Sequence, residues 1–229
     1  MRKWNENDEI IRYKTWFVAQ GFSQIPSIDY EETYPPIINT ITFWYLISLT
    51  VFEGLEICLM DVIATYLYGS IDTNIYMKVL EGFKLLETTN PKPQNMYSIK
   101  LQRSLYELKQ SGDMQYNRLS EYLLKERYVN NPIYPCVFIK KSETRLIIIA
   151  IYVDHLNLIW TPEKLTKTTN YLKKEFEMKD LGKTRYYLNL QIKHCLNDIS
   201  IHQSTYIEKV LKQFYIKKSH LLNFHMVVH

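Results

Sequence analysis

Residues 146–160 read LIIIAIYVDHLNLIW, and this stretch decides the fold. Residues 146–153 are consecutive apolar residues rich in β-branched side chains, and residues 156–160 form a second, mostly apolar run. Such runs predict two buried strands, and Asp154-His155 between them predicts a tight turn. Two-residue hairpin turns favour Asn-Gly or Asp-Gly, and Asp154-His155 matches this preference only at its first residue. This mismatch indicates that the side chains of the turn have a role other than forming it. A carboxylate at the tip of a buried hairpin is costly unless a cation meets it.

A second carboxylate occupies a similar place. Residues 55–62 are mostly apolar and predict another buried strand, with Asp61 near its end. If the strands are neighbours in one sheet, Asp61 and Asp154 come within reach of a shared divalent ion, and Mg²⁺ prefers such oxygen ligands. A pair of ions held in this way catalyses phosphoryl or nucleotidyl transfer. From these residues alone, two unrelated aspartates that only form turns are the alternative.

The rest of the chain mixes helices with antiparallel strands, which predicts the fold class α+β. No internal repeat and no Gly/Ser-rich linker divides the chain, so we expect one continuous unit with subdomains. Helices are predicted at 39–54, 113–128, 161–176 and 204–214, strands at 74–79, 185–194 and 199–202, and a loop at 91–93, with Asn39 or Thr40 and Ser204 as helix caps.

The composition excludes several classes of protein. With 229 residues, 46% of them hydrophobic and 23% charged, the chain has the composition of a folded globular protein, not of a disordered one. Only 6 glycines argue against glycine-rich phosphate loops, and the well-separated Cys58, Cys136 and Cys195 argue against a disulfide framework or a structural zinc site. Without a signal-peptide core at its start or a long enough apolar run, we expect an intracellular protein, cytoplasmic or nuclear, with no membrane partner.

Positive charge is concentrated toward the C-terminus. Residues 1–160 carry 16 basic and 18 acidic side chains, a net charge of −2, whereas residues 161–229 carry 12 basic and 6 acidic side chains, a net charge of +6. This distribution is typical of a protein that grips a phosphate backbone at one end. Solvated helix faces rich in lysine give the same count.

Several motifs resemble the reverse transcriptases of copia-type retrotransposons. Residues 152–155, YVDH, are similar to the Tyr-x-Asp-Asp box, and residues 60–69, MDVIATYLYG, are similar to the copia-type segment Met-Asp-Val-Lys-Thr-Ala-Phe-Leu-Asn-Gly. Further stretches resemble the family in the same order over nearly the whole chain: 12–14, 18–22, 28–34, 104–106, 108–110, 135–137, 176–182 and 206–211.

The resemblance implies a right-hand polymerase fold, with interleaved fingers and palm over residues 1–202 and the start of a truncated thumb or connection at 203–229. It implies the reverse transcriptase domain of a retrotransposon polyprotein, an RNA-directed DNA polymerase that works by two-metal nucleotidyl transfer. Its partners would be an RNA or DNA template with a primer, and deoxynucleoside triphosphates. The integrase and RNase H of the parent polyprotein are expected from the family, but their motifs are absent from this sequence.

The resemblance also assigns the metal site. Asp61 would be the first metal-binding aspartate, with the backbone carbonyl of Val62 beside it, and Asp154 the second; two Mg²⁺ or Mn²⁺ ions are expected. His155 stands where the family has another aspartate. Imidazole replaces an anionic oxygen ligand there and prefers softer metals than Mg²⁺, so we expect a weak or inactive polymerase.

Three residues match nucleotide-binding positions of the family. Tyr66 lies where an aromatic ring under the incoming sugar favours deoxynucleotides. Gln110 matches a glutamine near the nucleotide, and Lys14 matches a basic residue that meets the triphosphate. The alternatives are a core aromatic for Tyr66 and ordinary surface residues for the other two.

Four further departures from the family point to lost activity. Trp16 and Asp113 replace arginines, and Glu107 and Asn189 replace glycines, where a backbone that needs positive φ would be strained. An alternative function is therefore a catalytically inactive relic that only binds primer and template. A third possibility is a chain whose shortened thumb leaves it little affinity for a duplex.

Overall fold

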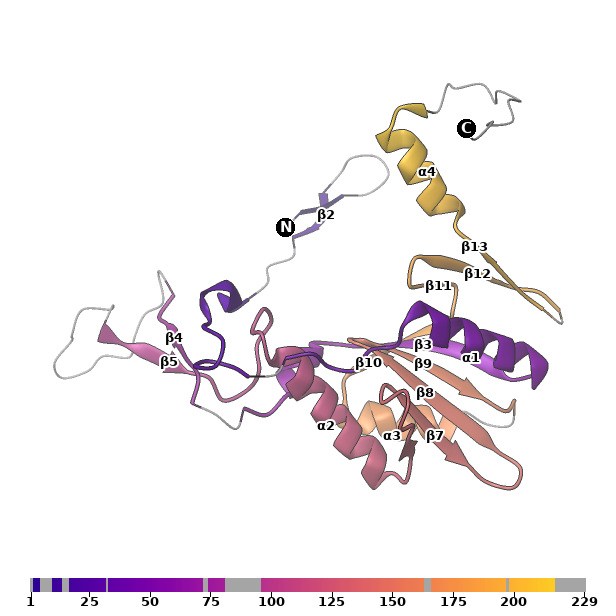
Figure 1. Ribbon diagram of the computed structural model, residues 1–229, viewed down its shortest axis with the longest axis horizontal. Helices are drawn as coiled ribbons and strands as arrows, with labels where there is room; N and C mark the ends of the chain where they lie inside the picture. The colour runs from indigo at the N-terminus through magenta and orange to yellow at the C-terminus, as the bar shows by residue number, and fades with distance from the viewer. Residues whose placement is uncertain are drawn as a thin grey trace, which may run out of the picture.

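The computed structural model describes residues 2–4, 10–13, 17–31, 33–71, 74–80, 96–162, 166–196 and 198–216. Its centre is an antiparallel six-stranded sheet in the order β10-β3-β9-β8-β7-β6 (Figure 1). The combination of this antiparallel sheet with helices confirms the predicted class α+β. Its strands are β3 (Glu56–Val62), β6 (Val129–Asn130), β7 (Val137–Lys141), β8 (Leu146–Tyr152), β9 (His155–Trp160) and β10 (Met178–Lys183).

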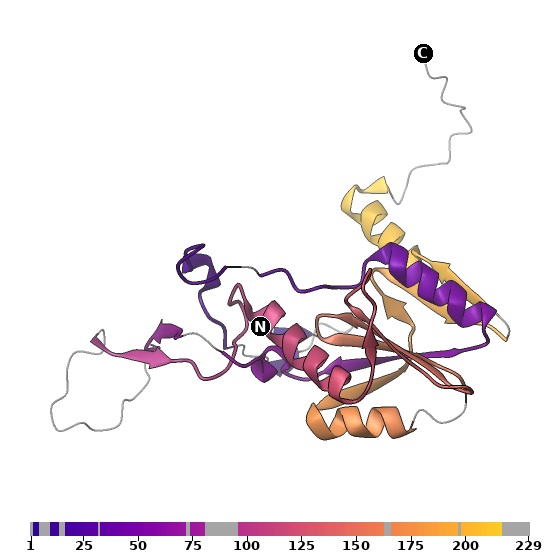
Figure 2. The same cartoon turned by 60° about the horizontal axis from the view of Figure 1, so that its bottom comes forward.

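Helices cover both faces of this sheet. One face carries α1 (Thr40–Phe52) and a smaller three-stranded sheet, and the other carries α2 (Ser111–Lys125) and α3 (Thr166–Glu175), as Figures 1 and 2 agree. Phe43 of α1 packs on Tyr187 of the small sheet, with ring centroids 4.5 Å apart. The small sheet contains β11 (Tyr186–Tyr187), β12 (Leu190–His194) and β13 (Ile199–His202).

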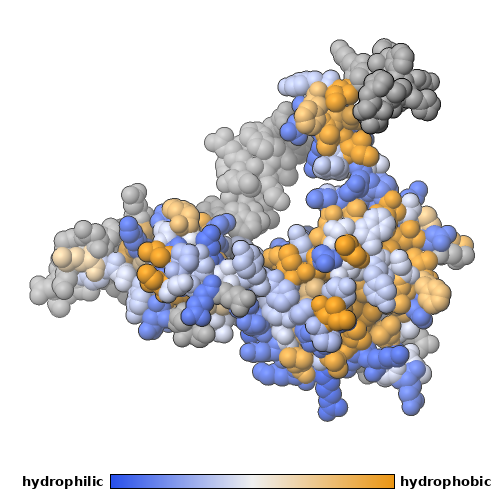
Figure 3. Space-filling view, in the orientation of Figure 1, coloured by the Kyte–Doolittle hydropathy of each residue, from blue (hydrophilic) through white to orange (hydrophobic). Residues whose placement is uncertain are grey.

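The remaining elements lie at the periphery. Two small hairpins are formed by β1 (Arg2–Trp4) with β2 (Ile10–Tyr13) and by β4 (Tyr76–Lys78) with β5 (Ser98–Lys100), and two 3₁₀ helices are η1 (Gly21–Ser23) and η2 (Thr65–Tyr68). Helix α4 (Ser204–Gln213) follows β13 and shows apolar side chains on its surface (Figure 3). Among the described residues, no helix combines the length and apolar character that a membrane span requires.

The core forms where the central strands meet the helices. Ile149, Leu156, Leu158 and Ile159 have no exposed surface, as expected for apolar strands that are covered on both faces. Asn157 is the polar exception on β9, and its Oδ1 accepts a hydrogen bond of 3.0 Å from the Thr184 hydroxyl. This bond satisfies Oδ1, whereas the buried Nδ2 has no hydrogen-bond partner among the described residues.

Several predicted elements are confirmed. Helix α1 begins at Thr40, and the side chain of Asn39 caps it by accepting from the Thr42 backbone N–H at 2.8 Å. The predicted strands at 55–62, 74–79 and 199–202 contain β3, β4 and β13, and the helices at 113–128 and 161–176 overlap α2 and α3. The predicted loop at 91–93 lies outside the described residues.

Two predictions need correction. The strand predicted at 185–194 is two strands, because Leu188 and Asn189 adopt φ values of +49° and +63° and turn the chain back between β11 and β12. Ser204, predicted as a helix cap, is the first residue of α4, where Gln203 occupies the cap position without a side-chain hydrogen bond. An apolar run does not reveal a turn within it when the turn residues are themselves apolar or neutral.

Candidate active site

The turn between β8 and β9 lies one residue earlier than predicted. Tyr152 pairs with His155, so Val153 and Asp154 form the turn and His155 is the first residue of β9. Val153 has φ of +55°, a conformation that is strained for a β-branched residue. This shift by one residue places Asp154 at the tip and brings His155 into the sheet, opposite Asp61 of β3.

Two hydrogen bonds hold the backbone of this turn. The side-chain amide of Gln115, a buried residue of α2, donates to the Val153 carbonyl at 3.2 Å. The backbone N–H of Val62 donates to the Asp154 carbonyl at 2.8 Å. The turn is therefore fixed to both a helix and the neighbouring strand, which positions the side chains that it carries.

Asp61, Asp154 and His155 form one cluster of possible metal ligands. One ligand atom from each residue lies within 4.8 Å of the others. His155 Nδ1 lies 3.2 Å from Asp154 Oδ1, and Nε2 lies 3.9 Å from Asp61 Oδ1. The side chains of Asp61, Asp154 and His155 are 32%, 44% and 37% exposed, so a phosphate or water can reach the cluster. The structure thus brings together the two predicted aspartates and the histidine that departs from the family.

Tyr66 lies beside this cluster on η2. Its ring meets the ring of Tyr106 edge to face, with centroids 4.9 Å apart. Burial raises the pKa of Tyr66, and the carboxylate of Asp154 raises it further. Burial also raises the pKa of Tyr106, followed by the charges of Asp154 and Asp61. Both tyrosines therefore lie within the electrostatic field of the aspartates.

Gln110 is buried directly before α2, and both groups of its amide have partners. Its Oε1 accepts from Gln24 at 3.0 Å, and its Nε2 donates to the Asp29 carbonyl at 3.1 Å. Gln110 therefore ties the segment around residues 24–29 to the start of α2. It is not the exposed side chain of the alternative interpretation. Lys14, the third predicted nucleotide-binding residue, lies outside the described residues, as does Trp16.

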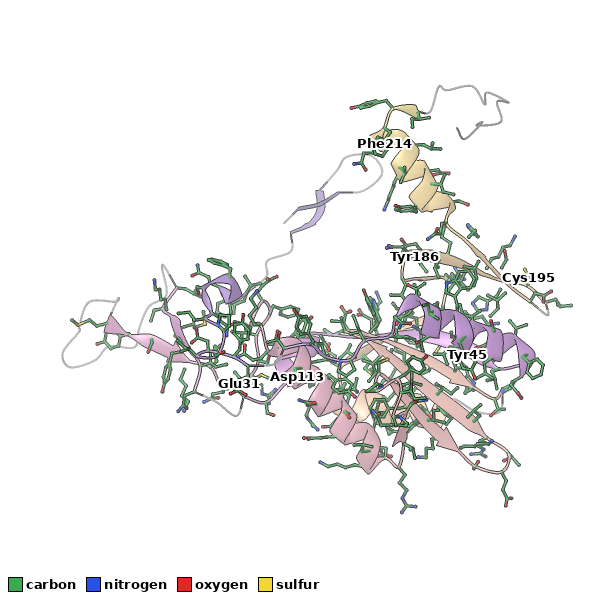
Figure 4. The ribbon with its side chains drawn as sticks, in the orientation of Figure 1. Glu31, Tyr45, Asp113, Tyr186, Cys195 and Phe214 are labelled. Carbon is green, nitrogen blue, oxygen red and sulfur yellow. The ribbon has the colours of Figure 1, made fainter. Side chains whose placement is uncertain are left out.

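The positive φ values expected where glycines were replaced are confirmed. Glu107 has φ of +71° and Asn189 has φ of +63°. Gly21 approaches the same loop so closely that an added Cβ would lie 1.7 Å from the Glu107 carbonyl oxygen. Asp113, labelled in Figure 4, lies in the first turn of α2 and accepts from Asn117 at 2.9 Å. A carboxylate stabilises a helix at this end, so Asp113 favours the fold although it adds negative charge.

A hollow of about 680 Å³ opens beside His155. It lies between the β8–β9 hairpin and the turn before β12, and Tyr186 on its wall is labelled in Figure 4. Its lining also includes two basic side chains, Lys183 and Arg185. Basic and aromatic side chains of this kind contact phosphates and sugars of nucleic acids.

Sequence reasoning missed the roles of Gln115 and Tyr106. Gln115 had a readable signal, because it is a polar residue at helical spacing from Leu119 on the apolar stripe of α2. A polar residue in such a stripe requires a partner, here the turn that carries Asp154. Tyr106 had no comparable signal, since its proximity to the aspartates depends on the tertiary fold.

Comparison with known proteins identifies the family of this chain. The family model described as reverse transcriptase (RNA-dependent DNA polymerase) matches residues 1–226. The chain is 31% identical over 215 residues to the retrovirus-related Pol polyprotein from transposon TNT 1-94 of Nicotiana tabacum, and covers 16% of that protein with 92% of its own length. It is 28% identical to the Pol polyprotein from transposon RE1 of Arabidopsis thaliana, with 92% of this chain and 14% of that protein covered.

A yeast relative extends the range of the similarity. The Ty1-H Gag-Pol polyprotein of Saccharomyces cerevisiae is 30% identical over 177 residues, which cover 73% of this chain and 9% of the relative. The chain thus spans a small part of each of these polyproteins. No solved structure matches it. The paired aspartates at adjacent strand ends and the match over almost the full length show that the chain belongs to the reverse transcriptase family, as a copia-type reverse transcriptase domain.

Proposed function

We propose that this chain is the RNA-directed DNA polymerase domain of a copia-type retrotransposon polyprotein, with its activity reduced by His155. The observation that carries the proposal is the meeting of Asp61 and Asp154, from separate segments of the chain, at one end of the sheet. We assign fingers and palm to residues 1–202 and the start of the thumb to residues 203–229, in a right-hand arrangement. The reaction joins a primer 3′-hydroxyl to a deoxynucleoside triphosphate on an RNA or DNA template.

The reverse transcriptase family generally uses divalent metals, and the residues present fit such ions in part. The two carboxylates offer the hard oxygens that Mg²⁺ or Mn²⁺ requires, whereas His155 offers a nitrogen. When bound, two such ions stabilise the charge that develops on the attacking and leaving oxygens of an in-line displacement. Asp61 and Asp154, beside the backbone of Val62, would hold them.

The nucleotide would bind next to these aspartates, against Tyr66. Tyr106 supports the Tyr66 ring from its side and restricts where that ring can move. A ring fixed under the sugar would exclude a 2′-hydroxyl by steric contact. Gln110 would contact the nucleotide by exchanging one of its amide partners, Gln24 or the Asp29 carbonyl, and Lys14 would meet the triphosphate.

The primer and template would lie along the basic side of the molecule. The hollow beside His155, with Lys183, Arg185 and Tyr186, supports this placement. The net charge of +6 over residues 161–229 supplies long-range attraction to phosphates. Contacts of this kind position a duplex by its shape and backbone, without reading its sequence.

Primer extension tests the proposal. On an RNA template with Mn²⁺ and deoxynucleotides, the unaltered chain should extend a primer slowly, and Asp154→Asn should abolish extension because it removes a carboxylate charge from the cluster. Asp198→Asn is the matched control, since Asp198 is exposed and belongs to the turn before β13. Equal extension by the unaltered chain and Asp154→Asn would refute the assignment of Asp154.

A binding protein without catalysis is the second candidate, favoured by the imidazole in place of a carboxylate ligand. A protein of this kind binds the primer–template duplex but does not extend the primer. Binding to a labelled primer–template should then weaken steeply between low and moderate salt, because lysines and arginines release counterions from the phosphates. If the chain binds the duplex in a salt-sensitive way but extends no primer with any divalent ion, this candidate is established and the polymerase is not.

A further inference from the structure

We propose that Asp61, Asp154 and His155 form a selective site for one divalent transition-metal ion, such as Mn²⁺, Co²⁺ or Zn²⁺, and bind Mg²⁺ weakly before any nucleotide arrives. This inference rests on the proposed function, because it concerns the metal of the same site. It goes further by naming the ion class that these particular side chains select.

The geometry of the histidine supports a ligand role. His155 Nδ1 lies 3.2 Å from Asp154 Oδ1, so the ring lies beside that carboxylate. His155 Nε2 lies 3.9 Å from Asp61 Oδ1, so each ring nitrogen lies near one of the two carboxylates. An imidazole beside two carboxylates adds a nitrogen donor to the same cluster.

The spacing of the donors fits a single ion. Two donors that are each about 2.1 Å from one ion lie roughly 3 to 3.4 Å apart in octahedral or tetrahedral coordination. The 3.9 Å between His155 Nε2 and Asp61 Oδ1 is slightly longer, and a small rotation of either side chain closes the difference. One ligand atom from each of the three residues lies within 4.8 Å of the other two.

The chemistry of the donors decides which ion binds. Mg²⁺ demands oxygen ligands in near-ideal octahedral geometry, and a nitrogen in this set satisfies it poorly. Imidazole suits the later divalent ions, whose affinity for mixed nitrogen and oxygen sites rises along the series from Mn²⁺ toward Cu²⁺. Two carboxylates with one imidazole therefore favour Mn²⁺, Co²⁺ or Zn²⁺ over Mg²⁺.

The scaffold keeps the donors in place without an ion. Val62 N–H holds the Asp154 carbonyl at 2.8 Å, and Gln115 holds the Val153 carbonyl at 3.2 Å. Strand pairing fixes Asp61 opposite His155. Little reorganisation is thus required for binding, and the exposed sides of the cluster leave coordination positions for water or substrate phosphates.

Direct metal titration of the protein alone tests this inference. By calorimetry, and by the visible absorption of Co²⁺, the unaltered chain should bind one Mn²⁺ or Co²⁺ with higher affinity than Mg²⁺. His155→Asp exchanges a nitrogen ligand for a carboxylate, so it should strengthen Mg²⁺ binding and lower the ratio of Co²⁺ affinity to Mg²⁺ affinity by about tenfold or more. His202→Asp is the matched control, because His202 is exposed and its ring contacts Ser204.

A second variant separates the donor type from the charge. His155→Asn removes the imidazole without adding a carboxylate, and should weaken Co²⁺ binding while leaving Mg²⁺ weak. Unchanged Co²⁺ affinity and absorption in folded His155→Asp and His155→Asn, or equal affinity of the unaltered chain for Mg²⁺ and Mn²⁺, would overturn the inference. Selective binding without primer extension in any metal would uphold the inference and overturn only the proposed catalysis, so the two can fail separately.

Discussion

Ile149 and Leu158 in the body of the six-stranded sheet have no exposed surface, whereas Asp154 and His155 at the end of the same hairpin are 44% and 37% exposed. The first pair determines whether the chain folds, because apolar burial is the main favourable term in folding. The second pair contributes little to packing, and in our proposal it determines which cation binds. A substitution such as His155 for an aspartate can therefore impair the chemistry while the sheet stays intact.

The largest expected loss of stability comes from a substitution in the six-stranded sheet. Leu158→Ala should lower the free energy of unfolding by about 2 to 5 kcal/mol, because it removes buried methyl groups and leaves a cavity. Urea denaturation measures this change. Leu196→Ala is the control, since Leu196 is 99% exposed and its truncation should stay within about 0.5 kcal/mol. Similar losses for both variants would contradict the packing that the structure describes.

Gln115→Leu tests how helix α2 of the packed body supports the turn that carries Asp154. It removes the hydrogen bond to the Val153 carbonyl, so the free energy of unfolding should fall by about 0.5 to 1.5 kcal/mol. Primer extension should fall further, by about 100-fold, because a small displacement of Asp154 misaligns the reacting groups. Asn117→Leu on the exposed side of α2 serves as the control. Extension that falls only in proportion to stability would show that Gln115 does not position the turn.

Glu107→Gly should stabilise the chain. Glu107 is exposed and has φ of +71°, which is unfavourable for a residue with a Cβ and costs nothing for glycine. The relief of about 1 to 2 kcal/mol is reduced by the greater flexibility of glycine in the unfolded chain, which leaves a gain of about 0.5 to 1 kcal/mol. Thermal unfolding measures the gain, and a loss of stability would show that the glutamate side chain has a favourable contact.

Asn189→Gly should have the smallest effect. Asn189 also has positive φ, but asparagine tolerates that conformation better than glutamate, and its Oδ1 accepts from the Tyr186 hydroxyl at 3.3 Å. We expect a change within about 0.5 kcal/mol of zero in the same thermal unfolding measurement. A gain larger than that of Glu107→Gly would reverse the order that backbone conformation predicts.

The sequence predicted the body of the sheet better than its end. Apolar runs identified β8, β9 and β3, and Asp61 and Asp154 were expected to meet if these strands were neighbours in one sheet, as the structure has them. The exact turn was not predictable from the pattern, because Val153 is apolar and continues the strand although its φ is +55°. That single residue decides whether His155 lies in a loop or in the sheet opposite Asp61.

Contacts between distant segments were also beyond the sequence pattern. Gln110 has a motif position but gives no sign that its amide binds Gln24 and Asp29. Strand β10 was not predicted, because residues 178–183 are largely exposed and do not alternate between buried and exposed side chains. They form a strand because they pair with β3. Pairing of this kind depends on the partner strand more than on local propensity.

The most direct test of the account compares the rate of primer extension by His155→Asp with that of the unaltered chain, in Mg²⁺ on an RNA template. If an intact sheet carries a site weakened at one ligand, restoring the carboxylate should raise the rate by on the order of a thousandfold, which corresponds to about 4 kcal/mol in the barrier. An unchanged rate in the folded variant would contradict the account, because His155 would then not be what limits catalysis.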